Sequence, residues 1–155
     1  METSLILIKP DGVQRRLMGR ILARFEEKGL QVVGAKLMKI PNELAERHYA
    51  VHKGKPFYPG LVGFMTSGPV LALALRGKNS VAVVRKMLGA TFGSKAEAGT
   101  IRGDFGISDG FNLVHASDAP ETAKNEVALF FRPEEVLDYE MADMAWVYDL
   151  SSDLR

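Results

Sequence analysis

Four short apolar segments, separated by helical patterns, constrain the fold of this chain more than any other feature. The apolar segments are residues 4–9, 30–38, 68–77 and 111–115. Each is short enough for a strand and is bounded by Gly, Pro or polar residues. Helical patterns occupy residues 17–28, 42–52, 81–88 and 120–131. This order predicts an α/β (α+β) sandwich with a ferredoxin-like βαββαβ core, in which helices pack on a four-stranded antiparallel sheet. A doubly wound parallel sheet is the alternative, since periodicity alone does not exclude it.

Capping residues set the expected ends of these helices. Gly29 is placed to end the first helix, because glycine readily adopts the left-handed backbone of a helix C-terminus. Asn42 is expected to cap the second helix, and Asn79 or Ser80 the third. Residues 10–12, Pro-Asp-Gly, follow the first strand and predict a turn.

The third helix and the segment after it have contrasting patterns. Val81, Val84 and Leu88 share one apolar side of the helix, and Arg85 lies outside that side. Residues 89–110 then form a long, glycine-rich connection between two elements. Connections of that length in compact domains are usually functional or disordered.

Length and composition bound the classes of protein that the chain can form. Its 155 residues, 46% of them hydrophobic, can bury the core of one ordinary domain, so we expect residues 1–155 to form a single domain. A net charge of +1 gives no bulk attraction to nucleic acid or to anionic lipid, so nucleic acid is not expected as a main partner. Cysteine is absent, which excludes disulfides and thiolate metal sites. No apolar run approaches the length of a membrane span, and a cytoplasmic protein is the expectation.

Standard phosphate and metal motifs do not explain the sequence. Neither GxxxxGK[ST] nor GxGxxG occurs. His48 and His52 are four residues apart, a spacing that can share a metal, but no third ligand is near in sequence. We therefore expect both to be solvated helix histidines, and we expect the acidic pairs at 26–27 and 134–135 to be solvated as well.

A histidine at the exit of a strand is the most unusual feature of the C-terminal half. In "NLVHASDAP", residues 112–120, apolar residues lead into His115, and Ser117 lies two residues further on. Basic, polar and aromatic residues stand at the ends of other elements as well. They are Lys9, Tyr49, Phe57, Arg85, Thr91, Arg102 and Asn112.

Six blocks that contain these residues resemble the signature sequences of nucleoside diphosphate kinases, in that family's order. The blocks are "IKPDGVQR", "KPFYPGLV", "TSGP", "MLGAT", "GTIRGDF" and "NLVHASD". The resemblance runs from about residue 4 to residue 148 and is highly specific, because NxxHxSD follows GTIRGDF. It implies reversible transfer of the γ-phosphoryl group of a nucleoside triphosphate, typically ATP, to a nucleoside diphosphate by a ping-pong mechanism.

The resemblance also assigns the nucleophile. It implies that His115 becomes a phosphohistidine, with Ser117 and Glu126 holding its ring. A histidine with its ordinary pKa of about 6.5 is largely neutral at pH 7, so its lone pair is available without a separate base.

Further roles follow from the same resemblance. Lys9, Arg85, Thr91 and Arg102 are expected to contact phosphates, which suits a reaction that depends on alignment and charge stabilisation. Tyr49 is expected to assist near Lys9 and the histidine, Asn112 to bond the sugar hydroxyl, and Phe57 to stack on the base. Mg²⁺ is expected on the nucleotide phosphates, without a dedicated protein site.

The chain departs from the family pattern at three places that bear on the base and on assembly. Asp109 and Phe111 stand where the family commonly has Val and a basic residue, and Phe92-Gly93 stands where Asn-Pro is usual.

Residues 149–155 form a C-terminal extension, and we expect Trp146 to serve packing or subunit contacts. A homo-oligomer is implied, with a hexamer favoured over a tetramer.

Two other classes of function are alternatives to a kinase. A non-enzymatic nucleotide sensor on the same fold would lose the nucleophile, whereas His115, Ser117 and Glu126 are all present. A nucleic-acid-binding module would need a basic face with exposed aromatic residues, which the near-zero net charge does not favour.

Overall fold

A single antiparallel sheet forms the centre of the computed structural model, which describes residues 1–154. Its strands are β1 (Glu2–Ile8), β2 (Gln31–Met38), β3 (Val70–Gly77) and β4 (Val114–Ala116). They lie in the order β2-β3-β1-β4, and each neighbouring pair is antiparallel. This arrangement confirms the ferredoxin-like prediction and excludes the doubly wound parallel sheet.

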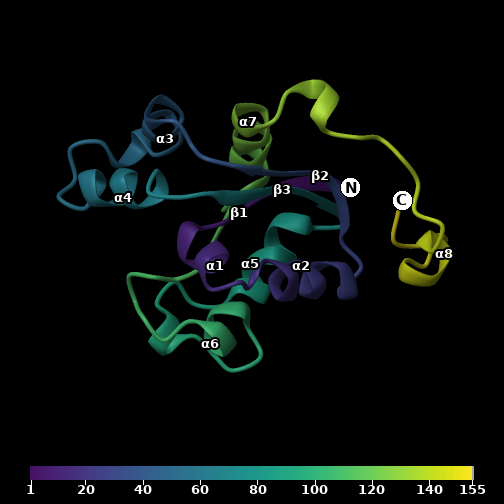
Figure 1. The fold of residues 1–155 in the computed structure, drawn as a ribbon. Helices are drawn as coiled ribbons and strands as arrows, with labels where there is room; N and C mark the ends of the chain where they lie inside the picture. Colours follow the sequence, from purple (N-terminus) through teal and green to yellow (C-terminus); the bar gives the residue numbers. More distant parts are fainter. Residues whose placement is uncertain (155) are drawn as a thin grey trace.

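Helices cover both faces of the sheet (Figure 1). α2 (Met18–Glu27) and α5 (Ser80–Leu88) lie on one face, and α7 (Pro120–Phe130) lies on the other. Side chains alternate along β1, so Ile6 and Ile8 join the core under α2 and α5, while Leu5 and Leu7 join the core under α7. The strand is buried on both sides, which explains its continuous apolar run.

Several predicted helix ends are confirmed and others are wrong. Gly29 has φ +96° directly after α2, as expected for a glycine stop. The expected turn at residues 10–12 is instead the start of a short helix, α1 (Pro10–Gln14), because proline suits the first helical position. Asn42 is the first residue of α3 (Asn42–His48), and Pro41 takes the cap position. Asn79 precedes α5 at the cap position but makes no side-chain capping bond.

Two lobes project beyond the sheet at the end where β4 begins (Figure 1). The α3–α4 lobe, residues 42–65, contains α3, the 3₁₀ helix η1 (Ala50–His52) and α4 (Tyr58–Met65), which the sequence analysis missed. The α6 lobe, residues 89–113, contains η2 (Gly93–Lys95) and α6 (Ile101–Phe105). The long connection is therefore ordered and partly helical.

Glycine at position 103 is required by the tight packing of the α6 lobe. A Cβ at this position would lie 1.8 Å from the backbone oxygen of Glu97 and 2.8 Å from Oγ1 of Thr100. We expect Gly103→Ala to lower the free energy of unfolding by about 2–3 kcal/mol, because backbone has to move to admit the methyl group. Denaturant unfolding followed by circular dichroism measures the change.

Gly60 in α4 provides the matched control. A Cβ there would meet no atom within 4 Å. Gly60→Ala should raise the free energy of unfolding by up to about 1 kcal/mol, since alanine favours a helix interior. Equal stability changes for the two variants would contradict the packing argument.

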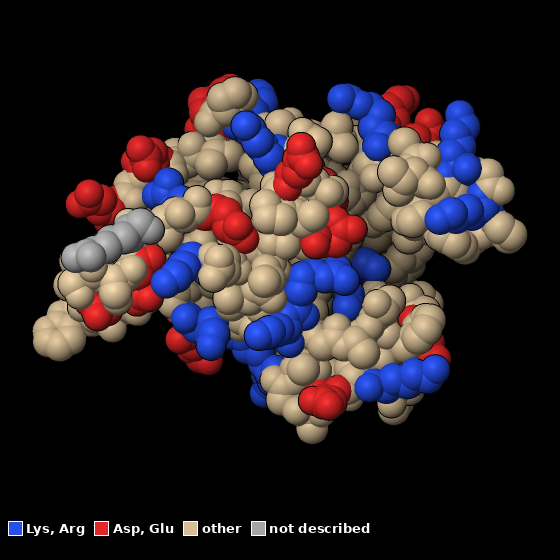
Figure 2. Space-filling model, turned by 180° about the vertical axis from the view of Figure 1, so that it is seen from behind, with Lys and Arg blue, Asp and Glu red and all other residues tan. Residues whose placement is uncertain are grey.

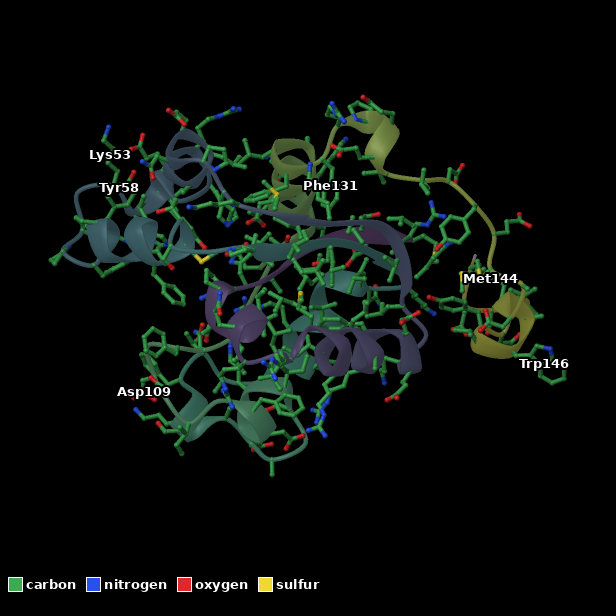
Figure 3. All side chains as sticks on the ribbon, in the orientation of Figure 1. Lys53, Tyr58, Asp109, Phe131, Met144 and Trp146 are labelled. Atoms are coloured by element: carbon green, nitrogen blue, oxygen red, sulfur yellow. The ribbon has the colours of Figure 1, made fainter. Side chains whose placement is uncertain are left out.

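The C-terminal segment leaves the body of the molecule after α7. It contains η3 (Pro133–Glu135) and α8 (Met144–Val147), which lies beyond the far end of the sheet (Figure 1). Trp146 is 92% exposed and points outward in Figure 3, so it does not pack within the described chain. Of the expected extension at 149–155, only Arg155 lies outside the described residues. Across residues 1–154, no helix is long and apolar enough to cross a membrane.

Candidate active site

Pairing of β1 with β4 brings distant parts of the sequence together at the base of the two lobes. His115 pairs with Leu7, and the backbone NH of Lys9 donates to the carbonyl of Leu113 at 2.8 Å. The Lys9 side chain then reaches Asn112, with Nζ 2.8 Å from Oδ1. The residue after β1 and the residues before β4 therefore share one site.

Glu126 fixes the chemical state of the His115 ring. Nε2 of His115 lies 2.8 Å from Oε2 of Glu126, on α7. Burial would raise the pKa of Glu126, but the hydrogen bond and charge of His115, together with the Ser117 hydroxyl, lower it below its usual value. An ionised carboxylate only accepts hydrogen bonds, so Nε2 carries the proton. In the neutral form of the ring the lone pair is consequently at Nδ1, which is the atom available as a nucleophile.

Ser117 anchors the end of β4 behind this pair. Its side chain is fully buried, and its Oγ accepts a hydrogen bond from the backbone NH of Leu5 at 3.1 Å. The hydroxyl thus fixes the strand that carries His115 against β1. A role in positioning the ring, as the resemblance implied, is compatible with this contact.

His48 lies against His115, contrary to the expectation that it would be solvated. Its side chain is 2% exposed, and the two imidazoles meet edge to face with ring centroids 4.7 Å apart. Burial, followed by the neighbouring charge of His115, lowers the pKa of His48 to about 3. His48 is therefore a neutral, buried group at neutral pH. A signal was available in the sequence, because Leu44 and Ala45 lie four and three residues before His48, on the same face of the helix, and both pack in the core.

Tyr49 is also buried beside the nucleophile. Its ring centroid lies 6.4 Å from that of His115, and its hydroxyl has no hydrogen-bond partner among the described residues. Burial and the charge of Glu126 raise the pKa of the phenol. Tyr49 therefore remains a neutral hydroxyl that can donate to an incoming group.

Three cationic side chains, Lys9, Arg85 and Arg102, come close enough to perturb one another. Burial first, and then Arg102, lowers the pKa of Lys9 to about 8. Burial first, and then Arg85, lowers the pKa of Arg102 to about 10. Clustered cations of this kind favour binding of an anion, which offsets their repulsion.

Arg102 is much more enclosed than a loop residue was expected to be. It is 5% exposed, and its guanidinium donates to the backbone carbonyls of Asn112, Gly89 and Val114 at 3.1, 3.2 and 2.6 Å. Arg85 is more open, with Nη1 3.4 Å from the carbonyl oxygen of Ala116. Arg102 therefore joins three backbone segments in addition to contributing charge.

The remaining predicted residues line the two lobes. Nδ2 of Asn112 donates to the carbonyl of Thr91 at 2.9 Å, which links two predicted site residues of the α6 lobe. Phe57, which precedes α4, is 53% exposed and meets His52 edge to face at 5.2 Å. The α3–α4 lobe thus carries the exposed ring of Phe57, and the α6 lobe carries Asn112 and Thr91.

Between the two lobes the surface is hollowed, and Lys and Arg side chains gather beside the hollow (Figure 2). We call this hollow the cleft. The site at the base of the two lobes combines cationic side chains, Lys9, Arg85 and Arg102, with a histidine whose Nε2 is held by Glu126. Such an arrangement can bind a phosphorylated ligand and attack its phosphorus.

Comparison with known proteins identifies the family. A family model described as nucleoside diphosphate kinase matches residues 2–136. The chain belongs to the nucleoside diphosphate kinase family. A nucleoside diphosphate kinase from Carboxydothermus hydrogenoformans is 54% identical over 149 residues, which cover 96% of this chain and 100% of that protein. One from Archaeoglobus fulgidus is 50% identical, with 96% and 99% covered.

Solved structures agree with the sequence comparison. The structure of a halophilic nucleoside diphosphate kinase from Halobacterium salinarum in complex with CDP has a TM-score of 0.93 at 48% identity, covering 95% of this chain and 98% of that one. A nucleoside diphosphate kinase family protein from Babesia bovis has a TM-score of 0.93 at 43% identity. The fold of the family therefore extends over almost the whole chain.

Two departures from the pattern of nucleoside diphosphate kinases have their own contacts in this chain. Asp109 lies at the rim of the α6 lobe, across from Lys53 and Tyr58 of the α3–α4 lobe (Figure 3), and its Oδ1 accepts a hydrogen bond from Ser94 at 2.5 Å. Phe111 is stacked at a tilt on Phe64 with ring centroids 5.3 Å apart. This aromatic pair joins the two lobes directly.

The lowered pKa of Lys9 predicts a pH dependence for this kinase. Lys9 is protonated below its pKa of about 8 and neutral above it, so its attraction for phosphate is lost as the pH rises through that value. We expect kcat/KM for ATP to fall by up to about tenfold per pH unit above pH 8. Lys9→Arg should move this fall to higher pH, whatever its effect on the maximal rate. An unchanged profile in Lys9→Arg would show that another group titrates.

Proposed function

We propose that this chain transfers the γ-phosphoryl group of a nucleoside triphosphate, typically ATP, to a nucleoside diphosphate by a ping-pong mechanism through a phosphohistidine on His115. The observation that carries the proposal is the hydrogen bond between Nε2 of His115 and Glu126. That bond leaves the Nδ1 lone pair free in a cleft with three cationic side chains. The kinase family and its named members support the same reaction.

The covalent step follows from the tautomer of His115. The Nδ1 lone pair attacks the γ-phosphorus, an N–P bond forms, and the bond between that phosphorus and the oxygen bridging to the β-phosphate breaks. The diphosphate leaves with the electron pair. The phosphorylated imidazole keeps its Nε2 proton, and the Glu126 carboxylate offsets the positive charge that develops on the ring. A second nucleoside diphosphate reverses these steps with its own terminal oxygen as the nucleophile.

The residues around His115 hold the nucleotide in line with Nδ1. Lys9, Arg85, Thr91 and Arg102 contact the phosphates, and the Tyr49 hydroxyl assists beside Lys9. Asn112 bonds the sugar hydroxyl, and Phe57 stacks on the base, whose π face is common to all nucleobases. Ser117 holds β4, and with it the ring, in place.

Mg²⁺ fits this site as a companion of the nucleotide. The side chains expected to face the phosphates are cations, and the Glu126 carboxylate is hydrogen-bonded to His115, so Mg²⁺ would be held by phosphate oxygens and water. When bound, Mg²⁺ neutralises phosphate charge and helps to fix the phosphate geometry. Alignment of the histidine remains the task of Glu126 and the strand.

Incubation of the protein with γ-labelled ATP alone tests the proposal. We expect label on the protein that is lost in acid and survives alkali, as for phosphohistidine. A two-substrate kinetic matrix should give parallel lines, because the first product leaves before the second substrate binds. Unlabelled protein, or intersecting lines that require a ternary complex, would contradict the mechanism.

The proposal also covers the domain organisation, the assembly and the cellular compartment of the enzyme. Residues 1–155 act as one catalytic domain, with a C-terminal extension at about residues 149–155. The protein is a cytoplasmic homo-oligomer, a hexamer in preference to a tetramer, and nucleic acid is not its main partner. The outward-facing Trp146 supports subunit contacts near the C-terminus, and light scattering measures the mass of the oligomer.

A further inference from the structure

His48 is a buried polar side chain whose two ring nitrogens have no hydrogen-bond partner among residues 1–154. The side chain is only 2% exposed. Oε1 of Glu126 is buried without a partner as well. Buried polar atoms usually have partners, so unpaired atoms on two adjacent residues call for a ligand or another explanation.

The three side chains around these atoms have the geometry of an incomplete metal site. Ligand atoms of His48, His115 and Glu126 all lie within 4.8 Å of one another. Oε2 of Glu126 is 2.8 Å from Nε2 of His115 and 3.4 Å from Nδ1 of His48. Ligands at about 2.0–2.1 Å from a tetrahedral zinc ion are roughly 3.3 Å apart, so small side-chain movements suffice.

The chemistry of the donors suits zinc better than magnesium. Two imidazoles and one carboxylate, with a fourth position left for water, match the ligand number of many zinc sites, whereas Mg²⁺ prefers oxygen ligands. The ligands His115 and Glu126 come from β4 and α7, which fix them on regular structure.

A surface hollow separate from the cleft lies next to this cluster. An open hollow on the surface between α3 and α7 is lined by Arg47, His48, Thr122, Asn125, Glu126 and Leu129. Two of the three ligand residues therefore border it. The nitrogens of His48 are themselves buried, so an ion entering from this side requires a movement of the side chains that cover them.

We propose that a zinc-type divalent cation binds to His48, Glu126 and Nε2 of His115, and that its binding switches off the nucleophile. The binding site stands on the geometry alone, and the switch rests on the function proposed above. Because a neutral imidazole has one proton, metal on Nε2 requires the proton to be on Nδ1. Nε2 loses its proton to solvent, Nδ1 gains one, and the lone pair that attacks the γ-phosphorus is no longer available.

Direct titration with Zn²⁺, without nucleotide, tests the binding site. Metal-free protein should bind one equivalent of Zn²⁺ in calorimetry, and Co²⁺ should give the visible absorption bands of a tetrahedral complex. Loss of a group that merely supports a ligand costs about 10–100-fold in affinity, so His48→Ala should weaken binding by at least about 100-fold. His48→Gln, which keeps more of the side-chain volume, should do the same.

His52 is the matched control for zinc binding. It is one of three histidines in a chain without cysteine, and it is not part of the cluster. His52→Ala should bind Zn²⁺ with unchanged affinity. Equal zinc affinity in folded His48→Gln and in the unsubstituted protein would overturn the proposed site.

Labelling with γ-labelled ATP tests the switch. With excess Mg²⁺ and a buffered concentration of free Zn²⁺ that fills the site, the rate of labelling should fall at least about tenfold, and a chelator should restore it. The proposed kinase reaction fails if labelling is absent without zinc, whereas the switch fails if zinc-saturated protein is labelled at the normal rate. Either result leaves the binding titration interpretable.

Discussion

Replacing His115 by alanine should abolish phosphoryl exchange between ATP and a second nucleoside diphosphate. Loss of a covalent nucleophile commonly costs at least about 10⁴-fold in kcat. The ring is partly exposed, and its one hydrogen bond is to Glu126, so the fold should tolerate the change. We expect the free energy of unfolding to change by no more than about 1 kcal/mol. Coupled assays with GDP and CDP as acceptors, together with denaturant unfolding, measure both quantities.

His52→Ala is the matched control for this experiment too. His52 is not part of the cluster of His48, His115 and Glu126. The variant His52→Ala should therefore still be labelled by γ-labelled ATP. Loss of label in His115→Ala but not in His52→Ala assigns the phosphoryl acceptor. Turnover comparable to the unsubstituted protein in His115→Ala would exclude His115 as the nucleophile.

Much of the fold was predictable because its strands and main helices carry strong local patterns. β1 and β3 are continuous apolar runs, and the apolar side of α5 is indeed buried at Val81, Val84 and Leu88. Helix α4 was missed because its sequence contains a proline and two glycines, which have weak helix propensity. Packing of residues such as Met65 against the core stabilises it instead. Local sequence patterns also did not show which strands are neighbours in the sheet, because β1 and β4 lie more than 100 residues apart in the sequence.

The site was predictable in its members but not in its contacts. Lys9, Asn112 and His115 do come together, because β1 and β4 are neighbours in the sheet. Local patterns could place His48 on the same helix face as Leu44 and Ala45, but they could not show that this face packs behind His115. Only the packing of α3 beside α7 buries it. The roles of individual residues toward a nucleotide stay predictions.

Arg102 shows most clearly what the structure adds to the sequence. An arginine in a glycine-rich segment is ordinarily a solvated charge. The buried guanidinium instead uses three of its five N–H donors on backbone carbonyls and has two left for a ligand. It therefore has both a structural and a binding role to separate by experiment.

Arg102→Ala should reduce both activity and stability. Loss of one donor to the transferring phosphoryl group lowers kcat/KM by about 10²–10³-fold. Three carbonyl groups also lose their partner, which should lower the free energy of unfolding by about 3 kcal/mol. Arg102→Lys should recover only part of either loss, because lysine supplies charge without the planar, forked arrangement of donors. Activity has to be measured well below the unfolding temperature of each variant, with GDP and CDP as acceptors.

Thr100→Ala separates the two roles of Arg102. Thr100 caps α6, where its Oγ1 accepts a hydrogen bond from the backbone NH of Gly103 at 3.0 Å, but it brings no charge to the cleft. Its replacement should cost about 1 kcal/mol of stability with little loss of kcat/KM. If Arg102→Ala lowers stability yet keeps near-normal kcat/KM with both acceptors, Arg102 is a structural anchor only, and the phosphate site rests on Lys9 and Arg85. A large loss of kcat/KM in Arg102→Ala together with normal kcat/KM in Thr100→Ala would instead show that the guanidinium contacts the reacting phosphate. Thr100→Ala weakens the same helix but keeps Arg102, so a loss of catalysis seen only in Arg102→Ala comes from the missing cation.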